Sequence, residues 1–131
     1  MVEPIISSPD ASKKPPRILC IGIPVRDLTF RVPGVPSRGS KENASHFGEI
    51  CGGNALNAAI GIVRLGGRAS ICGPMGDSHE GSSRYIFEKL AEEGIETEHI
   101  LHMPGLVTPI SAIMIDPSGE RTIVTFRDPG L

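Results

Sequence analysis

The sequence predicts an α/β fold built around a mostly parallel sheet. Apolar segments of strand length alternate with amphipathic segments of helical length from residue 17 onward, and glycine or proline separates most of them. Such alternation is typical of strand–helix–strand units that are joined by right-handed crossovers. A chain of 131 residues with 39% hydrophobic residues fits one globular domain.

The first three expected strands differ in character. Residues 17–23 form a continuous apolar run that ends at Pro24, which predicts a strand buried on both faces. Residues 28–32 alternate apolar and polar side chains, and residues 41–50 are mixed and mostly polar. We expect the last two to be exposed strands outside the parallel sheet, separated by a turn region over 33–39.

Two segments have helical periodicity. Residues 54–65 are apolar around most of the circumference, with Asn54 suited to the N-cap and Gly66-Gly67 to the C-terminal stop. Residues 82–93 are amphipathic and precede Gly94. Both helices should therefore pack against the sheet, the first more deeply than the second.

The remaining strands follow these helices. Short apolar segments at 68–72 and 95–101 complete the parallel sheet. Residues 107–115 and 122–126 then form β segments around a turn at 116–119, Asp-Pro-Ser-Gly.

Asp77 follows a glycine turn and leads into the second helix, which predicts a turn or capping role for its carboxylate.

Composition limits the class of protein. Residues 1–16 contain four prolines and no apolar periodicity, which predicts a disordered tail before a folded domain over 17–131. The net charge of −2 argues against a nucleic-acid partner, and no apolar run is long enough to cross a membrane. Without an apolar signal core, and with three cysteines in apolar or glycine settings, a reduced cytoplasmic protein is expected. The pattern of His, Cys and carboxylate residues predicts no metal site.

The most informative motif is a glycine turn that leads into a helix of small residues. Gly52 and Gly53 allow close approach of a ligand to the main chain. Asn57, one turn into the helix, can direct a carboxamide back to that turn, and its two donors and one acceptor suit the hydroxyls of a polyol. The alternative is a glycine turn before an ordinary core helix. Cys51 beside the turn is either a small buried cysteine or a reactive thiol.

The spacing of several residues resembles the first signature of the ribokinase-like (PfkB) carbohydrate kinases: Gly52-Gly53, Ala55, Asn57, Ala59, Gly66 and Gly76. Stretches at 22–27, 73–81 and 116–121 are similar to further parts of that family, and the resemblance runs from about residue 17 to the end. It implies a ribokinase-like three-layer sandwich with a central, mostly parallel sheet and a small β lid over a sugar site. The chain resembles the N-terminal portion only, so that the fold is expected to be truncated.

The resemblance also implies substrate-binding residues: Asp27, Gly52, Gly53, Asn54, Asn57 and Arg121. Asp27 would accept charge-assisted hydrogen bonds from sugar hydroxyls at the carboxyl edge of the sheet, and the alternative is a turn aspartate that binds its own backbone. Asn54 replaces the small or basic residue of many relatives, and it caps the helix, touches the sugar, or does both. Arg121 and Arg127 recognise an anionic substituent or are solvated strand charges.

The activity implied by the family is ATP-dependent phosphorylation of a sugar hydroxyl, with ATP and Mg²⁺ as cofactors. The family keeps its catalytic aspartate and phosphate-binding glycine turn in its C-terminal half, and the 131 residues contain no Gly-Ala-Gly-Asp-like or Walker-type segment. No catalytic residue and no nucleotide site is therefore assigned within this chain.

The expected partners are a small-molecule sugar and a second copy bound through the lid. The alternative is a truncated, non-catalytic fragment that binds a sugar or a protein partner. A dinucleotide-binding oxidoreductase is disfavoured because its glycine fingerprint is absent.

Overall fold

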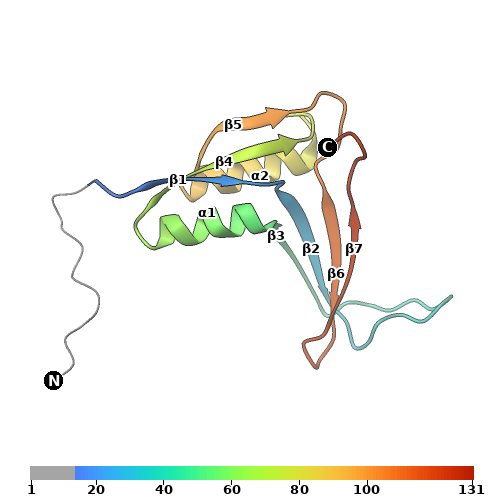
Figure 1. The fold of residues 1–131 in the computed structure, drawn as a ribbon. Coiled ribbons are helices and arrows are strands. Elements are labelled where there is room, and N and C mark those ends of the chain that lie inside the picture. The colour runs from blue at the N-terminus through green and yellow to red at the C-terminus, as the bar shows by residue number, and fades with distance from the viewer. Residues whose placement is uncertain (1–13) are drawn as a thin grey trace, which may run out of the picture.

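The computed structural model describes residues 14–131, so the predicted tail lies almost entirely outside the described residues. Three parallel strands form the first sheet: β1 (Arg17–Ile21), β4 (Arg68–Met75) and β5 (Glu96–His102). Their order is β1-β4-β5, with β4 in the centre. Figure 1 shows the first helix below the β1 edge of this sheet and the second helix behind β1 and β4. The predicted parallel sheet is thereby confirmed.

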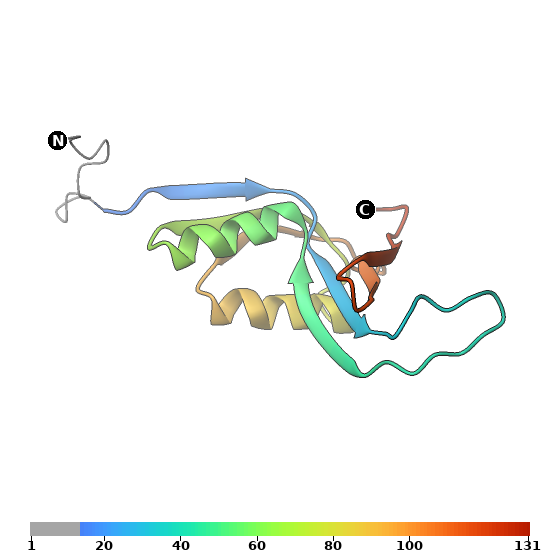
Figure 2. The same ribbon diagram turned by 90° about the horizontal axis from the view of Figure 1, so that it is seen from below.

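A second sheet, here called the lid sheet, projects away from the parallel sheet (Figure 1). It contains β2 (Val25–Arg31), β3 (His46–Gly52), β6 (Ile110–Ile115) and β7 (Arg121–Phe126), in the order β3-β2-β6-β7. The β2 strand pairs antiparallel with β3 and parallel with β6, and β7 closes the hairpin after β6. The connection between β2 and β3 extends furthest from the parallel sheet (Figure 2). The expected β lid is confirmed, although the strand predicted over 107–115 begins only at Ile110.

Both helices, α1 (Asn54–Arg64) and α2 (Gly81–Glu92), cover the same face of the parallel sheet (Figures 1 and 2). Side chains from both helices and all three strands form one core between these layers, and its main members are Cys20, Leu56, Ala59, Ile71, Met75, Ile86, Leu90 and Ile100. None of the described helices is long and apolar enough to cross a membrane.

The other face of the parallel sheet has no helix over it in the described part of the chain. The strand register places Ile21, Cys72 and Leu101 on this face. Ile21 is 75% exposed and Leu101 is 61% exposed. The prediction that β1 is buried on both faces is therefore wrong, since Cys20 alone is buried in this strand. The described residues form two layers of the three-layer sandwich.

The ends of the helices refine the expected caps. The N-cap of α1 is Gly53, with φ of 95°, and Asn54 is the first helical residue, so the predicted Asn54 cap is wrong. Gly66, with φ of 86°, follows the helix as predicted and occupies the left-handed region that favours glycine. The α2 helix begins after Glu80, whose carboxylate accepts hydrogen bonds from the N–H groups of Ser82 and Ser83.

Gly76, the last glycine of the signature, lies where the segment entering β6 crosses the end of β4. Its N–H donates to Thr108 Oγ1 at 2.8 Å. A Cβ at this position would lie 2.4 Å from the backbone nitrogen of Thr108 and 2.6 Å from the carbonyl oxygen of Leu106. Gly76 therefore permits the close crossing that carries the chain from the parallel sheet into the lid sheet.

Replacing Gly76 by alanine is expected to lower the free energy of unfolding by about 1–3 kcal/mol, because the added methyl group overpacks a backbone crossing. Urea denaturation measures this change. Gly61→Ala is the matched control: Gly61 lies inside α1, and an added methyl group would meet no atom within 4 Å, so this variant should be more stable by roughly 0.5–1 kcal/mol. Equal stability of Gly76→Ala and the parent chain would contradict this role of the crossing.

Candidate functional site

Asp27 lies inside β2, on the lid sheet, and not in a turn. It pairs with Ile50 of β3 on one side and with Ser111 of β6 on the other. Its carboxylate occupies the space above Gly52, where a Cβ would lie 2.0 Å from Oδ2. Gly52 is therefore required for this position of the carboxylate, since any side chain at residue 52 would displace it.

The Asp27 carboxylate has no hydrogen-bond or ion-pair partner among residues 14–131, in contrast to the other aspartates within this range. Asp77, Asp116 and Asp128 each accept hydrogen bonds from nearby backbone N–H groups. A half-buried carboxylate without a protein partner retains its capacity to accept hydrogen bonds from a ligand. The turn-aspartate alternative for Asp27 has no support in this geometry.

The N-terminus of α1 follows directly on Gly52. Gly53 adopts φ of 95°, and a Cβ there would lie 2.6 Å from the carbonyl oxygen of Ile23. No side chain caps this helix, and its first helical hydrogen bond runs from the N–H of Asn57 to the carbonyl oxygen of Gly53. The preceding N–H groups of the first turn thus have no intrahelical acceptor, and the positive end of the helix dipole lies at Gly53, directly after the Gly52 that Asp27 contacts.

Donors and an acceptor therefore converge at one point of the fold. The uncapped amides of α1 can donate to hydroxyl oxygens, while the Asp27 carboxylate can accept from hydroxyl hydrogens. The N-terminus of α2 offers no comparable site, because Glu80 already caps it. The arrangement suits a neutral ligand rich in hydroxyl groups.

The two asparagines of the motif lie on exposed positions of α1. Asn57 lines a hollow of about 320 Å³ between α1, β3 and α2, together with Cys51, Tyr85 and Lys89. Burial raises the pKa of the Cys51 thiol to about 11, so that it is protonated and weakly nucleophilic at neutral pH. Neither asparagine has a hydrogen bond to Asp27 in the described structure, and Asn54 is free to turn towards a ligand at the helix start.

Arg121 lies at the far end of the lid sheet. It begins β7 opposite Ile115 of β6, whereas Asp27 is level with Ser111 of the same strand. Four residues of strand correspond to roughly 13 Å. The structure therefore places Arg121 on the same face of the lid as Asp27, but not beside it.

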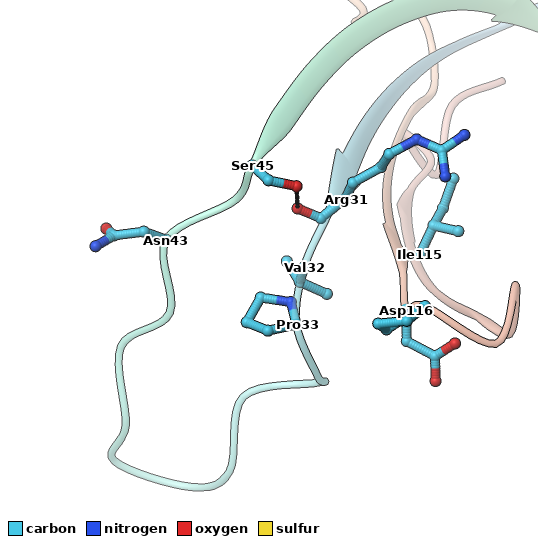
Figure 3. Close-up of a pocket in the computed structure, with 8 residues that line it drawn as sticks. Arg31, Val32, Pro33, Asn43, Ser45, Ile115 and Asp116 are labelled. Carbon is cyan, nitrogen blue, oxygen red and sulfur yellow. Dashed lines mark hydrogen bonds between the residues drawn. The ribbon is translucent and has the colours of Figure 1, made fainter.

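A second hollow, of about 360 Å³, opens at this far end and is shown in Figure 3. It is lined by Arg31, Val32, Pro33, Asn43, Ser45, Ile115, Asp116 and Pro117. Oδ1 of Asp116 already accepts hydrogen bonds from the 116–120 turn. Because the hollow lies at the opposite end of β2 from the helix start, we do not assign it to the same ligand.

Asp77 has the structural role that its position in the sequence predicts. Its carboxylate accepts hydrogen bonds from the N–H of His79 at 2.9 Å and the N–H of Gly105 at 3.3 Å. These bonds, the one from His79 above all, lower the pKa of Asp77. Among the described residues, no group of three or more His, Cys, Asp or Glu side chains is placed to hold a metal ion.

Comparison with known proteins agrees with this geometry. The model of the family described as pfkB family carbohydrate kinase matches residues 15–130. The chain belongs to this family. Fructokinase-2 of Solanum lycopersicum is 30% identical over 112 residues, which cover 86% of this chain. The resemblance of the signature residues to PfkB proteins is thus confirmed.

Solved structures of the family show the same fold. Ribokinase from Giardia lamblia is 30% identical, with a TM-score of 0.74 over 84% of this chain. Fructokinase from Xylella fastidiosa with bound ATP is 26% identical, with a TM-score of 0.65 over 86% of this chain. The pfkB chain described here spans 32% of the Solanum fructokinase, 35% of the Giardia ribokinase and 33% of the Xylella fructokinase. It corresponds to about a third of a carbohydrate kinase of this family.

Proposed function

We propose that this pfkB chain is the sugar-binding part of a carbohydrate kinase. The observation that carries the proposal is the half-buried Asp27 carboxylate, which lies over Gly52 without a protein partner beside the uncapped start of α1. Asp27 accepts hydrogen bonds from two hydroxyls, while Gly53 and the first-turn amides donate to the ring or hydroxyl oxygens. Asn54 supplies a further contact from the helix start, and Asn57 would contribute one after turning away from the hollow that it lines beside Tyr85.

The whole reaction is ATP-dependent phosphorylation of a sugar hydroxyl, with Mg²⁺. The residues described here do not fit the nucleotide or its metal, since no cluster of metal ligands is present among them and the sequence has no glycine-rich turn that ends in a catalytic aspartate. This chain therefore contributes substrate binding and exclusion of water by the lid sheet, and no phosphoryl-transfer step is assigned to its residues. Arg121 would contact a substrate only if that substrate reached along the lid.

The proposal extends to the oligomeric state of the protein and to its location in the cell. The lid sheet exposes Phe47, Val124 and Phe126 on one face, which suits contact with a second copy of the chain. The three cysteines are free thiols, which supports the proposal of a reduced, cytoplasmic protein. The competing proposal is a non-catalytic fragment that binds a sugar or a protein partner.

An activity assay separates phosphoryl transfer from sugar binding. The purified 131-residue chain, incubated with fructose or ribose, ATP and Mg²⁺, is expected to produce no sugar phosphate, because its sequence contains no phosphate-binding glycine turn followed by a catalytic aspartate. A longer form that carries a glycine-rich turn ending in aspartate should be active. Turnover by the highly purified chain alone would contradict the division of roles proposed here.

A further inference from the structure

Arg26, the neighbour of Asp27, makes the contacts that fix the base of the lid sheet. Consecutive residues of a strand point to opposite faces, so Arg26 points away from the proposed sugar side. Its guanidinium forms an ion pair with Glu49 of β3 at 2.8 Å. It also stacks over the ring of Tyr85 on α2, with 4.9 Å between the guanidinium carbon and the ring centroid.

Tyr85 closes this cluster from the helix side. Its hydroxyl donates a hydrogen bond to the backbone carbonyl oxygen of Glu49 at 2.8 Å. Burial raises the pKa of Tyr85, which keeps the hydroxyl protonated as a donor. One side chain of α2 is therefore bound to two adjacent strands of the lid at once: to β2 through Arg26 and to β3 through Glu49.

The cluster is placed to control the orientation of the sugar-binding residue. Rotation of β2 about its own axis would move Asp27 off Gly52, and the same rotation would pull Arg26 off Tyr85. We propose that Arg26, Glu49 and Tyr85 form a latch that holds the lid base against α2 and thereby positions the Asp27 carboxylate for sugar binding. Arg26 and Tyr85 are positioning residues in this account, which rests on the proposed sugar site.

The energetics of the latch favour positioning over stability. The Nε of Arg26 is buried without a hydrogen-bond partner within the described structure. An incompletely satisfied, partly buried ion pair contributes little net stability, and apolar replacement of such pairs is often neutral. Loss of the latch should therefore change the position of the Asp27 carboxylate while changing the free energy of unfolding only slightly.

The test uses the 131-residue chain with Ile21→Lys and Leu101→Lys as the parent, because these changes remove exposed apolar side chains from the uncovered sheet face. Two latch variants are made in this parent: Tyr85→Leu and the double variant Arg26→Met/Glu49→Gln. Calorimetric titration with fructose and with ribose should show an affinity loss of roughly three- to tenfold for each variant, as expected for loss of a partly desolvated cation–π contact and its neighbours. Tyr85→Phe keeps the ring over Arg26 but removes the hydrogen bond to Glu49, so it should lose less affinity than Tyr85→Leu. Phe87→Leu is the matched control, since Phe87 lies on the same helix but stacks on His102.

Two-dimensional NMR supplies a readout that does not depend on sugar. Cross-peaks between the Asp27 side chain and the Gly52 α-protons should weaken in Tyr85→Leu and persist in Phe87→Leu, while the urea midpoints of both stay close to the parent value. Unchanged cross-peaks in Tyr85→Leu would overturn the latch. Loss of these cross-peaks together with a much lower urea midpoint in both latch variants would also overturn the latch, because it would indicate general unfolding.

The two proposals fail in different ways. If the parent chain binds neither sugar, or Asp27→Ala binds as the parent does, the sugar site is wrong, and the cross-peaks still decide whether the latch orients Asp27. If Asp27→Ala loses binding but both latch variants bind like the parent, the latch is wrong and the sugar site stands.

Discussion

Replacement of Asp27 by alanine is expected to abolish most sugar affinity of this chain. Hydrogen bonds to a charged acceptor contribute about 1.5–3 kcal/mol each, so the loss of two corresponds to at least a hundredfold weaker binding. Calorimetric titration with fructose and ribose measures this change. Asn57→Ala should weaken binding less, because a neutral carboxamide makes weaker hydrogen bonds than a carboxylate.

Thr29→Ala is the matched control for Asp27→Ala. Thr29 lies two residues further along β2 on the same face, and its hydroxyl donates to the carbonyl oxygen of Gly48 at 3.1 Å. Its replacement should leave sugar affinity within about twofold of the parent, since one neutral hydroxyl–backbone bond contributes little. Unaltered affinity in Asp27→Ala, or an equal loss in Thr29→Ala, would show that the carboxylate does not carry binding.

The uncovered face of the parallel sheet is expected to dominate the behaviour of the isolated chain. Ile21 and Leu101 are exposed there, and β1 and β5 each present an open edge within the described sheet. Exposed apolar sheet faces and open strand edges promote association. We expect the chain to bind a hydrophobic dye, to unfold with low stability, and to sediment mainly as an oligomer.

Lysine substitutions locate the source of this behaviour. The pair Ile21→Lys and Leu101→Lys should reduce dye fluorescence and raise the monomer fraction in analytical ultracentrifugation. Leu65→Lys is the control, because Leu65 is 90% exposed at the end of α1, away from this face. A monodisperse parent monomer with a sharp thermal transition and no dye binding would refute the prediction.

The sequence predicted the elements whose signal is local. Glycine turns and apolar periodicity placed both helices to within about one residue at each end, and the polar character of the 28–32 and 41–50 segments separated the lid from the parallel sheet. Asp27 was expected just after the first strand and is found inside the second, because the short 22–24 connection leaves room for β2 to begin at Val25.

Other features depend on contacts that no local pattern contains. The continuous apolar run of β1 predicts burial on both faces, but such a run does not identify the residues that would pack against each face. Asn54 has the composition of an N-cap, yet the positive φ of Gly53 starts the helix one residue earlier and leaves Asn54 inside it. The contact of Arg26 with Tyr85 joins residues far apart in the chain, so neither residue stood out in the sequence.

The most direct test of the sugar site is an NMR titration with fructose and ribose of the isotope-labelled chain that carries Ile21→Lys and Leu101→Lys. We expect saturable shifts of the backbone amides of Gly52, Gly53 and Asn54–Asn57, together with the Asp27 amide, and no such shifts in Asp27→Ala. Amides at the far end of the lid, around Arg31 and Asp116, should remain unchanged. Shifts confined to that far end, or the same shifts in parent and Asp27→Ala, would contradict a sugar site formed by Asp27 and the start of α1.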